Sequence, residues 1–178
     1  MTRPCDLDAV DARKLIGNKK LSPLELTKSC IEQIEKLNPS INAVVAIDKA
    51  DVLKQAKKAE DDVMSGSELG LLHGLPVGIK DLNIVKNLRS TSGSKIYENR
   101  IPESDDTIVE DIRSEGAIIF CKTNTPEFGA GGNTKNFVYG ATSNPFDITK
   151  TPAGSSGGSA AALACNMMPL ANGSDYGG

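Results

Sequence analysis

The chain has 178 residues, and this length favours residues 1–178 belonging to one domain rather than to several. Its formal net charge is −3 and its pI is about 5.2, with basic and acidic residues interspersed, so the composition excludes a general basic surface for direct nucleic-acid binding. The chain shows no apolar leader and no run of about 18 apolar residues, so we expect a cytoplasmic protein without a membrane span.

The four cysteines are far apart and lack the paired spacing of a zinc site; they are Cys5, Cys30, Cys121 and Cys165. Cys30 and Cys121 lie in apolar segments, where a cysteine packs as a small hydrophobic residue. We therefore expect free thiols, no disulfide framework and no metal site.

The first 65 residues are typical of a helical region. Ser22 is followed by Pro23 at the first helical position and by Glu25 at the third, which is the pattern of a capping box. The Asn38–Pro39 pair predicts the end of this helix. An apolar stripe at helical spacing lies between these signals and consists of Leu26, Cys30, Ile34 and Leu37.

Strands and helices alternate beyond this helix. Residues 43–47 predict a short buried strand, and Asp48 is placed to cap a second helix that ends at the Ser65–Gly66–Ser67 turn. Two more buried strands are predicted over residues 75–79 and 117–122. The alternation favours an α/β sheet over an all-helical fold.

Two further helices are predicted around the last of these strands. One opens at residues 104–106, runs through Arg113 and has Gly116 as its C-terminal cap. The other is a helix-forming run over residues 160–165, directly behind a turn rich in serine and glycine. We see no internal repeat.

Lys80 directly follows the strand predicted over residues 75–79. Burial disfavours the charged ammonium, so the pKa of Lys80 should fall below the ordinary lysine value. A neutral lysine can accept a proton from a hydroxyl, which is what a serine nucleophile requires. Asp81 should point to the opposite face, because successive strand residues alternate. An exposed lysine at a strand end is the alternative.

The turn Gly154–Ser159 is the second chemical feature. A flexible linker is one interpretation, although linkers rarely lead directly into a helix-forming run. The G-x-S-x-G pattern around Ser156 is typical of a nucleophile elbow, which needs a histidine downstream. The only histidine, His73, lies upstream and is expected in a loop. The chain therefore cannot complete a Ser–His–Asp triad.

The last residues, Tyr176, Gly177 and Gly178, form the third feature. Glycines allow successive backbone N–H groups to point into one concavity. Such a concavity suits an oxyanion, because fixed donors stabilise the charge that develops in a transition state. An ordinary glycine turn is the alternative.

Together these segments resemble the amidase signature family. The resemblance covers nearly the whole chain in the family's order and spacing, over residues 37–39, 42–44, 74–81, 122–128, 140–145 and 154–159. It implies a mixed central β-sheet flanked by helices, with an N-terminal helical region, of which only the N-terminal part is expected here. Residues 1–65 would be the helical region and residues 66–178 the start of the catalytic α/β core.

The resemblance implies a Ser–cisSer–Lys triad that hydrolyses an amide through an acyl-enzyme. Lys80 matches the family lysine, and Ser155 matches the bridging serine, whose peptide bond is typically cis. Tyr176, Gly177 and Gly178 match the oxyanion hole. The nucleophilic serine would be the next residue, so we expect the 178-residue chain alone to be inactive and poorly soluble.

The resemblance also implies that the loop Gly129–Ala130–Gly131 lines the acyl site, where its small residues would leave room for substrate. It implies a small-molecule amide substrate and neither a metal nor an organic cofactor. Homo-oligomerisation stays open.

Three functions stay open at this point. The first is a stand-alone amidase, and the second is the glutaminase subunit of a Glu-tRNA(Gln)/Asp-tRNA(Asn) amidotransferase, which would work with partner subunits. Such a subunit usually carries Met-Asp-Glu-Phe and a Met-Gly-Ser stretch where this chain has residues 125–131, so we favour the amidase. The third is a non-catalytic fragment or pseudoenzyme that serves as a binding module.

Overall fold

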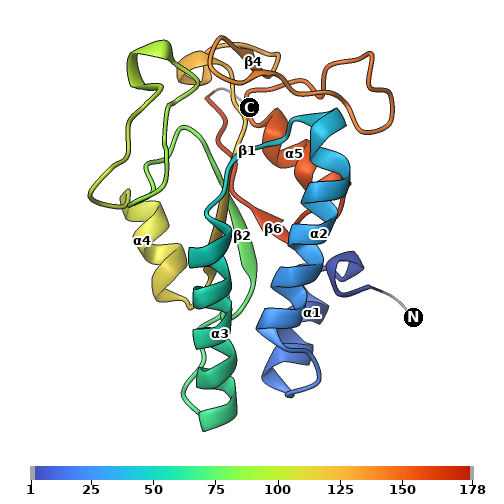
Figure 1. Ribbon diagram of the computed structural model, residues 1–178, viewed down its shortest axis with the longest axis vertical. Coiled ribbons are helices and arrows are strands. Elements are labelled where there is room, and N and C mark those ends of the chain that lie inside the picture. The colour runs from blue at the N-terminus through green and yellow to red at the C-terminus, as the bar shows by residue number, and fades with distance from the viewer. Residues whose placement is uncertain (1–2, 177–178) are drawn as a thin grey trace.

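The computed structural model describes residues 3–176. Figure 1 shows a central sheet with helices around it. The helices are α1 (Ala9–Gly17), α2 (Pro23–Ile41), α3 (Lys49–Ser65), α4 (Thr107–Ser114) and α5 (Gly157–Ala164), with short 3-10 turns η1 (Pro4–Asp6), η2 (Lys95–Tyr97) and η3 (Glu127–Gly129). The strands are β1 (Val44–Ala46), β2 (Pro76–Lys80), β3 (Ile118–Thr123), β4 (Lys135–Asn136), β5 (Gly140–Ala141) and β6 (Leu170–Ala171).

The main sheet has the strand order β1-β3-β2-β6. β2 runs parallel to both β3 and β6, whereas β1 pairs with β3 in the antiparallel direction. The parallel pair β2 and β3 is joined by a crossover that contains α4, as parallel pairing requires. The expected α/β architecture with a mixed sheet is therefore confirmed. β4 and β5 form a separate antiparallel hairpin.

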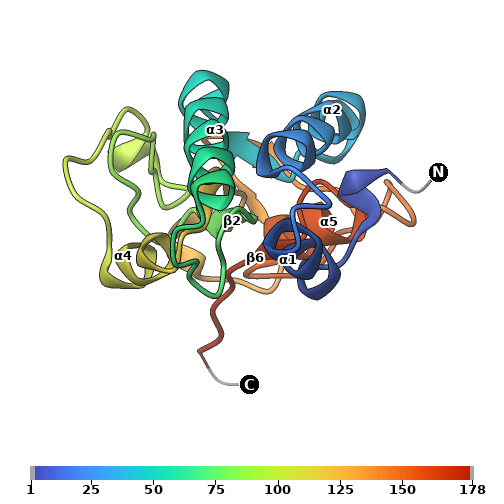
Figure 2. The same cartoon turned by 90° about the horizontal axis from the view of Figure 1, so that it is seen from below.

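Hydrophobic side chains pack on both faces of this sheet. Ile118 and Phe120 belong to the larger cluster, with residues of α1, α2, α3 and α5. Val77 and Ile119 belong to a second cluster, with Val109 of α4. Figure 2 shows the same arrangement, with α4 on one side of β2 and with α2 and α5 on the other. The alternation of strand side chains thus supplies both layers of the core.

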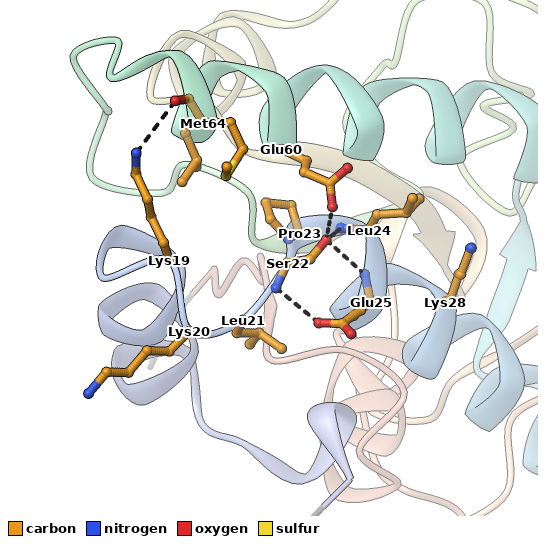
Figure 3. Close-up of a pocket in the computed structure, with 11 residues that line it drawn as sticks. Lys19, Lys20, Leu21, Ser22, Pro23, Leu24, Glu25, Lys28, Glu60 and Met64 are labelled. Carbon is orange, nitrogen blue, oxygen red and sulfur yellow. Dashed lines mark hydrogen bonds between the residues drawn. The ribbon is translucent and has the colours of Figure 1, made fainter.

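The start of α2 has the predicted capping box. The Ser22 hydroxyl accepts hydrogen bonds from the backbone N–H groups of Leu24 and Glu25, at 3.0 and 3.3 Å. The Glu25 carboxylate accepts in turn from the Ser22 N–H at 3.2 Å. Figure 3 shows that the Ser22 hydroxyl also reaches Glu60 of α3, to which it donates. The cap therefore joins two helices as well as starting one.

The predicted end of this helix at Asn38–Pro39 is wrong, because α2 continues to Ile41 with Pro39 inside its last turn. Proline removes only one N–H donor there, so the loss is confined to one hydrogen bond. The Asn38 side chain binds the chain beyond the helix, accepting from the Val44 N–H and donating to the Val44 carbonyl, both at 2.8 Å. Asn42 then ends the helix with φ at 56°.

The other predicted elements are confirmed to within a few residues. The three predicted strands correspond to β1, β2 and β3, and the run over residues 160–165 corresponds to α5, which begins earlier at Gly157. Asp48 caps α3 by accepting from the Asp51 N–H at 3.0 Å. Gly66 and Gly116, which follow helices, have φ of 78° and 79°, a conformation that favours glycine.

All four cysteines are buried free thiols, and Cys30 and Cys121 are fully buried in the core as predicted. Burial raises the pKa of both of these thiols. Within residues 3–176, the helices are too short or too polar to cross a membrane. The same residues contain no group of three or more His, Cys, Asp or Glu side chains placed to hold a metal ion.

Candidate active site

Lys80 is the last residue of β2, and its side chain is fully buried. Its Nζ atom donates hydrogen bonds to the Ser155 hydroxyl at 2.7 Å and to the Ser174 hydroxyl at 2.8 Å. Ser155 lies in the turn before α5, and Ser174 lies in the segment after β6. Three segments that are distant in sequence thus bring one amine and two hydroxyl groups together.

The peptide bond between Gly154 and Ser155 is cis, as the resemblance implied. Threonines hold the turn around it on both sides. The Thr125 hydroxyl donates to the Ser155 carbonyl at 3.2 Å. The Thr134 hydroxyl donates to the Ala153 carbonyl at 2.9 Å. The position of Ser155 is therefore fixed through the backbone, and its side chain stays available to Lys80.

Close packing at the start of α5 explains the glycines in this turn. A Cβ atom on Gly158 would lie 2.5 Å from the Asn124 carbonyl oxygen, closer than real Cβ contacts. The Gly158 N–H donates to this same carbonyl at 3.2 Å. Only glycine lets the α5 backbone approach the end of β3 this closely. The glycine at the start of α5 therefore allows close packing beside Ser155, and the turn is not a flexible linker.

The electrostatic environment of Lys80 shifts its protonation equilibrium toward the neutral amine. Burial lowers its pKa below the ordinary lysine value, and the negative charge of Asp175 partly opposes this shift. The predicted direction of the shift is confirmed. A neutral amine beside a serine hydroxyl carries a lone pair that can accept the hydroxyl proton.

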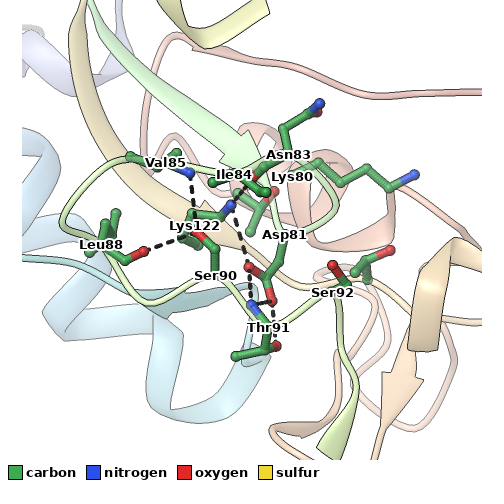
Figure 4. A network of polar contacts seen from close by, with 12 residues as sticks. Lys80, Asp81, Asn83, Ile84, Val85, Leu88, Ser90, Thr91, Ser92 and Lys122 are labelled. Carbon is green, nitrogen blue, oxygen red and sulfur yellow. Dashed lines mark hydrogen bonds and ion pairs between the residues drawn. The ribbon is translucent and has the colours of Figure 1, made fainter. Parts of the chain in front are cut away.

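Asp81 points away from Lys80, as the alternation along the strand predicts (Figure 4). Its carboxylate lies 3.4 Å from the Nζ atom of Lys122, and both side chains are fully buried. It also accepts from the Thr91 N–H at 3.1 Å and from the Thr91 hydroxyl at 2.6 Å. Burial lowers the pKa of Lys122, and Asp81 counteracts this shift. The carboxylate beside Lys80 is therefore committed to a separate ion pair.

The loop Gly129–Ala130–Gly131 lies beside a cavity of about 500 Å³, whose lining includes Ala130 and Gly131. Gly129 instead packs against Leu82, where an added Cβ atom would lie 2.6 Å from a side-chain methyl carbon. Asn136 also lines the cavity and donates to the Thr125 carbonyl at 2.7 Å. The cavity and the turn that carries Ser155 therefore share Thr125 as a neighbour.

The remaining predicted residues lie elsewhere or outside the described part of the chain. Tyr176 is described and has a fully exposed side chain. Gly177 and Gly178 lie outside the described residues. His73 lies in a turn as expected, but it is buried, and its Nε2 atom forms a 3.0 Å hydrogen bond with the Ala59 carbonyl oxygen of α3.

Sequence reasoning missed three residues that contact Lys80 or Ser155. Ser174 was visible in the terminal glycine-rich segment, yet no pattern indicated its contact with the amine. Thr125 contacts the backbone of Ser155, and Asn172 contacts the backbone of Lys80. Threonine and asparagine are common in loops, so their identity alone carried no signal for these contacts.

Comparison of the sequence with known proteins finds one matching family model and many related proteins. The family model described as Amidase matches residues 25–178. A glutamyl-tRNA(Gln) amidotransferase subunit of Clostridium botulinum (strain Alaska E43 / Type E3) is 41% identical over 170 residues, which cover 96% of this chain and 35% of that protein. The chain thus spans about a third of the length of this curated relative.

Solved structures of amide-cleaving enzymes are similar over the same region. A bacterial aryl acylamidase of the amidase signature family superposes with a TM-score of 0.86 at 32% identity, over 93% of this chain and 34% of that chain. The peptide amidase from Stenotrophomonas maltophilia superposes with a TM-score of 0.86 at 29% identity, over 93% of this chain and 35% of that chain.

Proposed function

Because the chain belongs to the amidase family, we propose that its full-length protein hydrolyses a carbon–nitrogen amide bond through a serine acyl-enzyme. Lys80 and Ser155 form the proton relay in this proposal. The observation that carries it is the 2.7 Å hydrogen bond between the Lys80 amine and the Ser155 hydroxyl. The lowered pKa of Lys80 supports the same role, since a base must be neutral to accept a proton.

The proposed reaction has two stages. Neutral Lys80 accepts the proton of Ser155, and Ser155 accepts the proton of a nucleophilic serine, which the family resemblance puts directly after Gly178. The serine oxygen forms a bond to the amide carbonyl carbon, and the proton returns through the relay to the leaving amine or ammonia as the C–N bond breaks. Water then hydrolyses the acyl-enzyme to release the carboxylate.

We assign supporting roles to the neighbouring residues. Ser174 holds the Lys80 amine from a second side. The backbone N–H groups of Tyr176, Gly177 and Gly178 would donate to the oxyanion that forms on the substrate. Gly129, Ala130 and Gly131 would leave room for the acyl group. If Ala130→Phe left the preference among acyl groups unchanged in the full-length enzyme, this last assignment would be wrong.

A second candidate function is the glutaminase subunit of a tRNA-dependent amidotransferase. The 41% identity to the subunit from Clostridium botulinum favours it. The sequence of residues 125–131 favours a stand-alone amidase instead, because it departs from the pattern usual in such subunits. Under the second candidate, the substrate amide would be glutamine and partner subunits would be required.

The test uses the full-length protein purified alone. A panel of small carboxamides and aryl amides is incubated with the wild type and with Ser155→Ala, and the release of ammonia or amine is followed. We expect hydrolysis of at least one amide by the wild type and a loss of about 10²- to 10⁴-fold in Ser155→Ala. The amidotransferase would be favoured if glutamine were the one amide that releases ammonia, and if this release required added partner subunits. Equal hydrolysis rates for the wild type and Ser155→Ala would refute the proton relay.

A further inference from the structure

The strand beside Lys80 ends before it can hydrogen-bond the lysine backbone. β6 pairs with β2 only through Leu170 and Ala171. The Asp81 N–H bonds to β3 on one side, so the Lys80 N–H faces the β6 side, because successive N–H groups of a strand alternate. The side chain of Asn172 takes the place of the missing strand residue. Its Oδ1 atom accepts from the Lys80 N–H at 2.6 Å.

Because the Asn172 side chain replaces a backbone partner of Lys80, the main chain can leave the sheet after this residue. The Asn172 N–H still donates to the Gly78 carbonyl at 2.9 Å, which is the last backbone hydrogen bond between this segment and β2. The main chain is then free to leave the sheet. Two residues later, Ser174 reaches the Lys80 amine at 2.8 Å. Asn172 thus joins the backbone of Lys80 to the segment that binds its side chain.

A second asparagine fixes the orientation of the Asn172 amide. The Asn172 Nδ2 atom donates to the Asn83 Oδ1 atom at 2.9 Å, and the Asn83 Nδ2 atom donates to the Asp106 carboxylate at 3.2 Å. A backbone N–H only donates and a carboxylate only accepts, so the two ends of this series determine both amide orientations. A flip of either amide would bring two donors or two acceptors together.

Asn83 is itself held close to Lys80, beside which Figure 4 draws it. Its N–H donates to the Lys80 carbonyl at 3.0 Å, and its carbonyl accepts from the Lys122 amine. We propose that Asn172 and Asn83 are positioning residues that hold the backbone of Lys80, and through it the amine, in register with Ser155. They take no proton themselves. This inference rests on the proposed function, in which Lys80 is the base.

The test combines hydrogen exchange and kinetics in the full-length protein. Asn172→Leu keeps the approximate size of the side chain but removes the acceptor for the Lys80 N–H. We expect amide exchange at Lys80 to accelerate about tenfold, as for the loss of one hydrogen bond. We expect kcat on the best amide of the panel to fall about 10- to 100-fold with KM nearly unchanged, because the base is misplaced and binding is not. Asn18→Leu, at an exposed site after α1, is the control.

Two outcomes would overturn the inference: unchanged exchange at Lys80, or accelerated exchange with unchanged kcat. If the wild type hydrolyses no amide, the proposed function fails, and the exchange result alone decides whether Asn172 holds the lysine backbone. If Asn172→Leu does not fold, Asn83→Ala replaces it, because Asn83 lies in a loop and its removal takes away the acceptor that orients the Asn172 amide. A several-fold fall in kcat supports the inference, and no change overturns it.

Discussion

The substitution Asp81→Asn tests the buried ion pair that follows the active-site strand. Asp81 and Lys122 are both fully buried, and their charged groups lie 3.4 Å apart. At an effective dielectric constant of about 20, two unit charges at this separation attract by about 5 kcal/mol. The cost of desolvating both charges offsets much of this attraction in the native protein. Removing one partner leaves the other charge buried, which costs about 3–5 kcal/mol.

Lys122 can relieve part of this cost by losing its proton. Burial already lowers the pKa of Lys122, and Asp81 opposes this shift more strongly than any other charge. Without Asp81 the folded-state pKa of Lys122 falls further below the value in the unfolded chain. The unfolded state then binds more protons, so the stability of Asp81→Asn should rise with pH through the window between the two pKa values. The stability lost in Asp81→Asn should therefore be largest just below this window, where Lys122 is charged in both states.

The assay is urea unfolding of the full-length protein, applied to Asp81→Asn, Lys122→Met and the double variant. We expect the double variant to lose clearly less than the sum of the two single variants, because no unpaired charge is left. Glu35→Gln is the control, since it breaks an ion pair with Lys49 in which both side chains are about half exposed; it should cost under about 1 kcal/mol. Additive losses, or a loss in Asp81→Asn as small as in the control, would refute the reasoning.

Three other predictions concern the caps, the packing and the base. Ser22→Ala should lower stability by about 1 kcal/mol, because the capping box and the Glu60 contact are lost; an unchanged Tm would contradict this. Gly158→Ala should cost about 1–3 kcal/mol through overpacking, whereas Gly132→Ala should cost little, since an added Cβ there has no neighbour within 4 Å; equal losses in urea unfolding would exclude the packing explanation. Asp175→Asn should move the acid limb of kcat/KM to lower pH, because Asp175 raises the pKa of Lys80; a shift to higher pH would count against Lys80 as the base.

Local signals in the sequence were sufficient for most of the fold. The capping pattern at Ser22 and the buried strand before Lys80 depend on neighbouring residues, so they can be recognised without tertiary information. Pro39 shows the limit of such rules. The missing N–H of Pro39 costs one hydrogen bond, and the helix continues for two more residues to Ile41.

Contacts that depend on the path of the chain could not be predicted in the same way. β6 has only two residues, and it pairs with the edge of β2 that β3 does not occupy. Ser174 approaches Lys80 because the chain leaves the sheet at Asn172. The partner of Asp81 lies in another strand, far along the chain. Each of these contacts joins distant segments, whereas sequence patterns describe near neighbours.

The most direct test of the account is kcat/KM for amide hydrolysis by the full-length protein and by Lys80→Met. The methionine keeps the length of the side chain without the amine. Lys36→Met, which removes an exposed lysine on α2, is the control. The account predicts a loss of about 10²- to 10⁴-fold for Lys80→Met and none for the control. A loss smaller than about tenfold would show that Lys80 is not the general base.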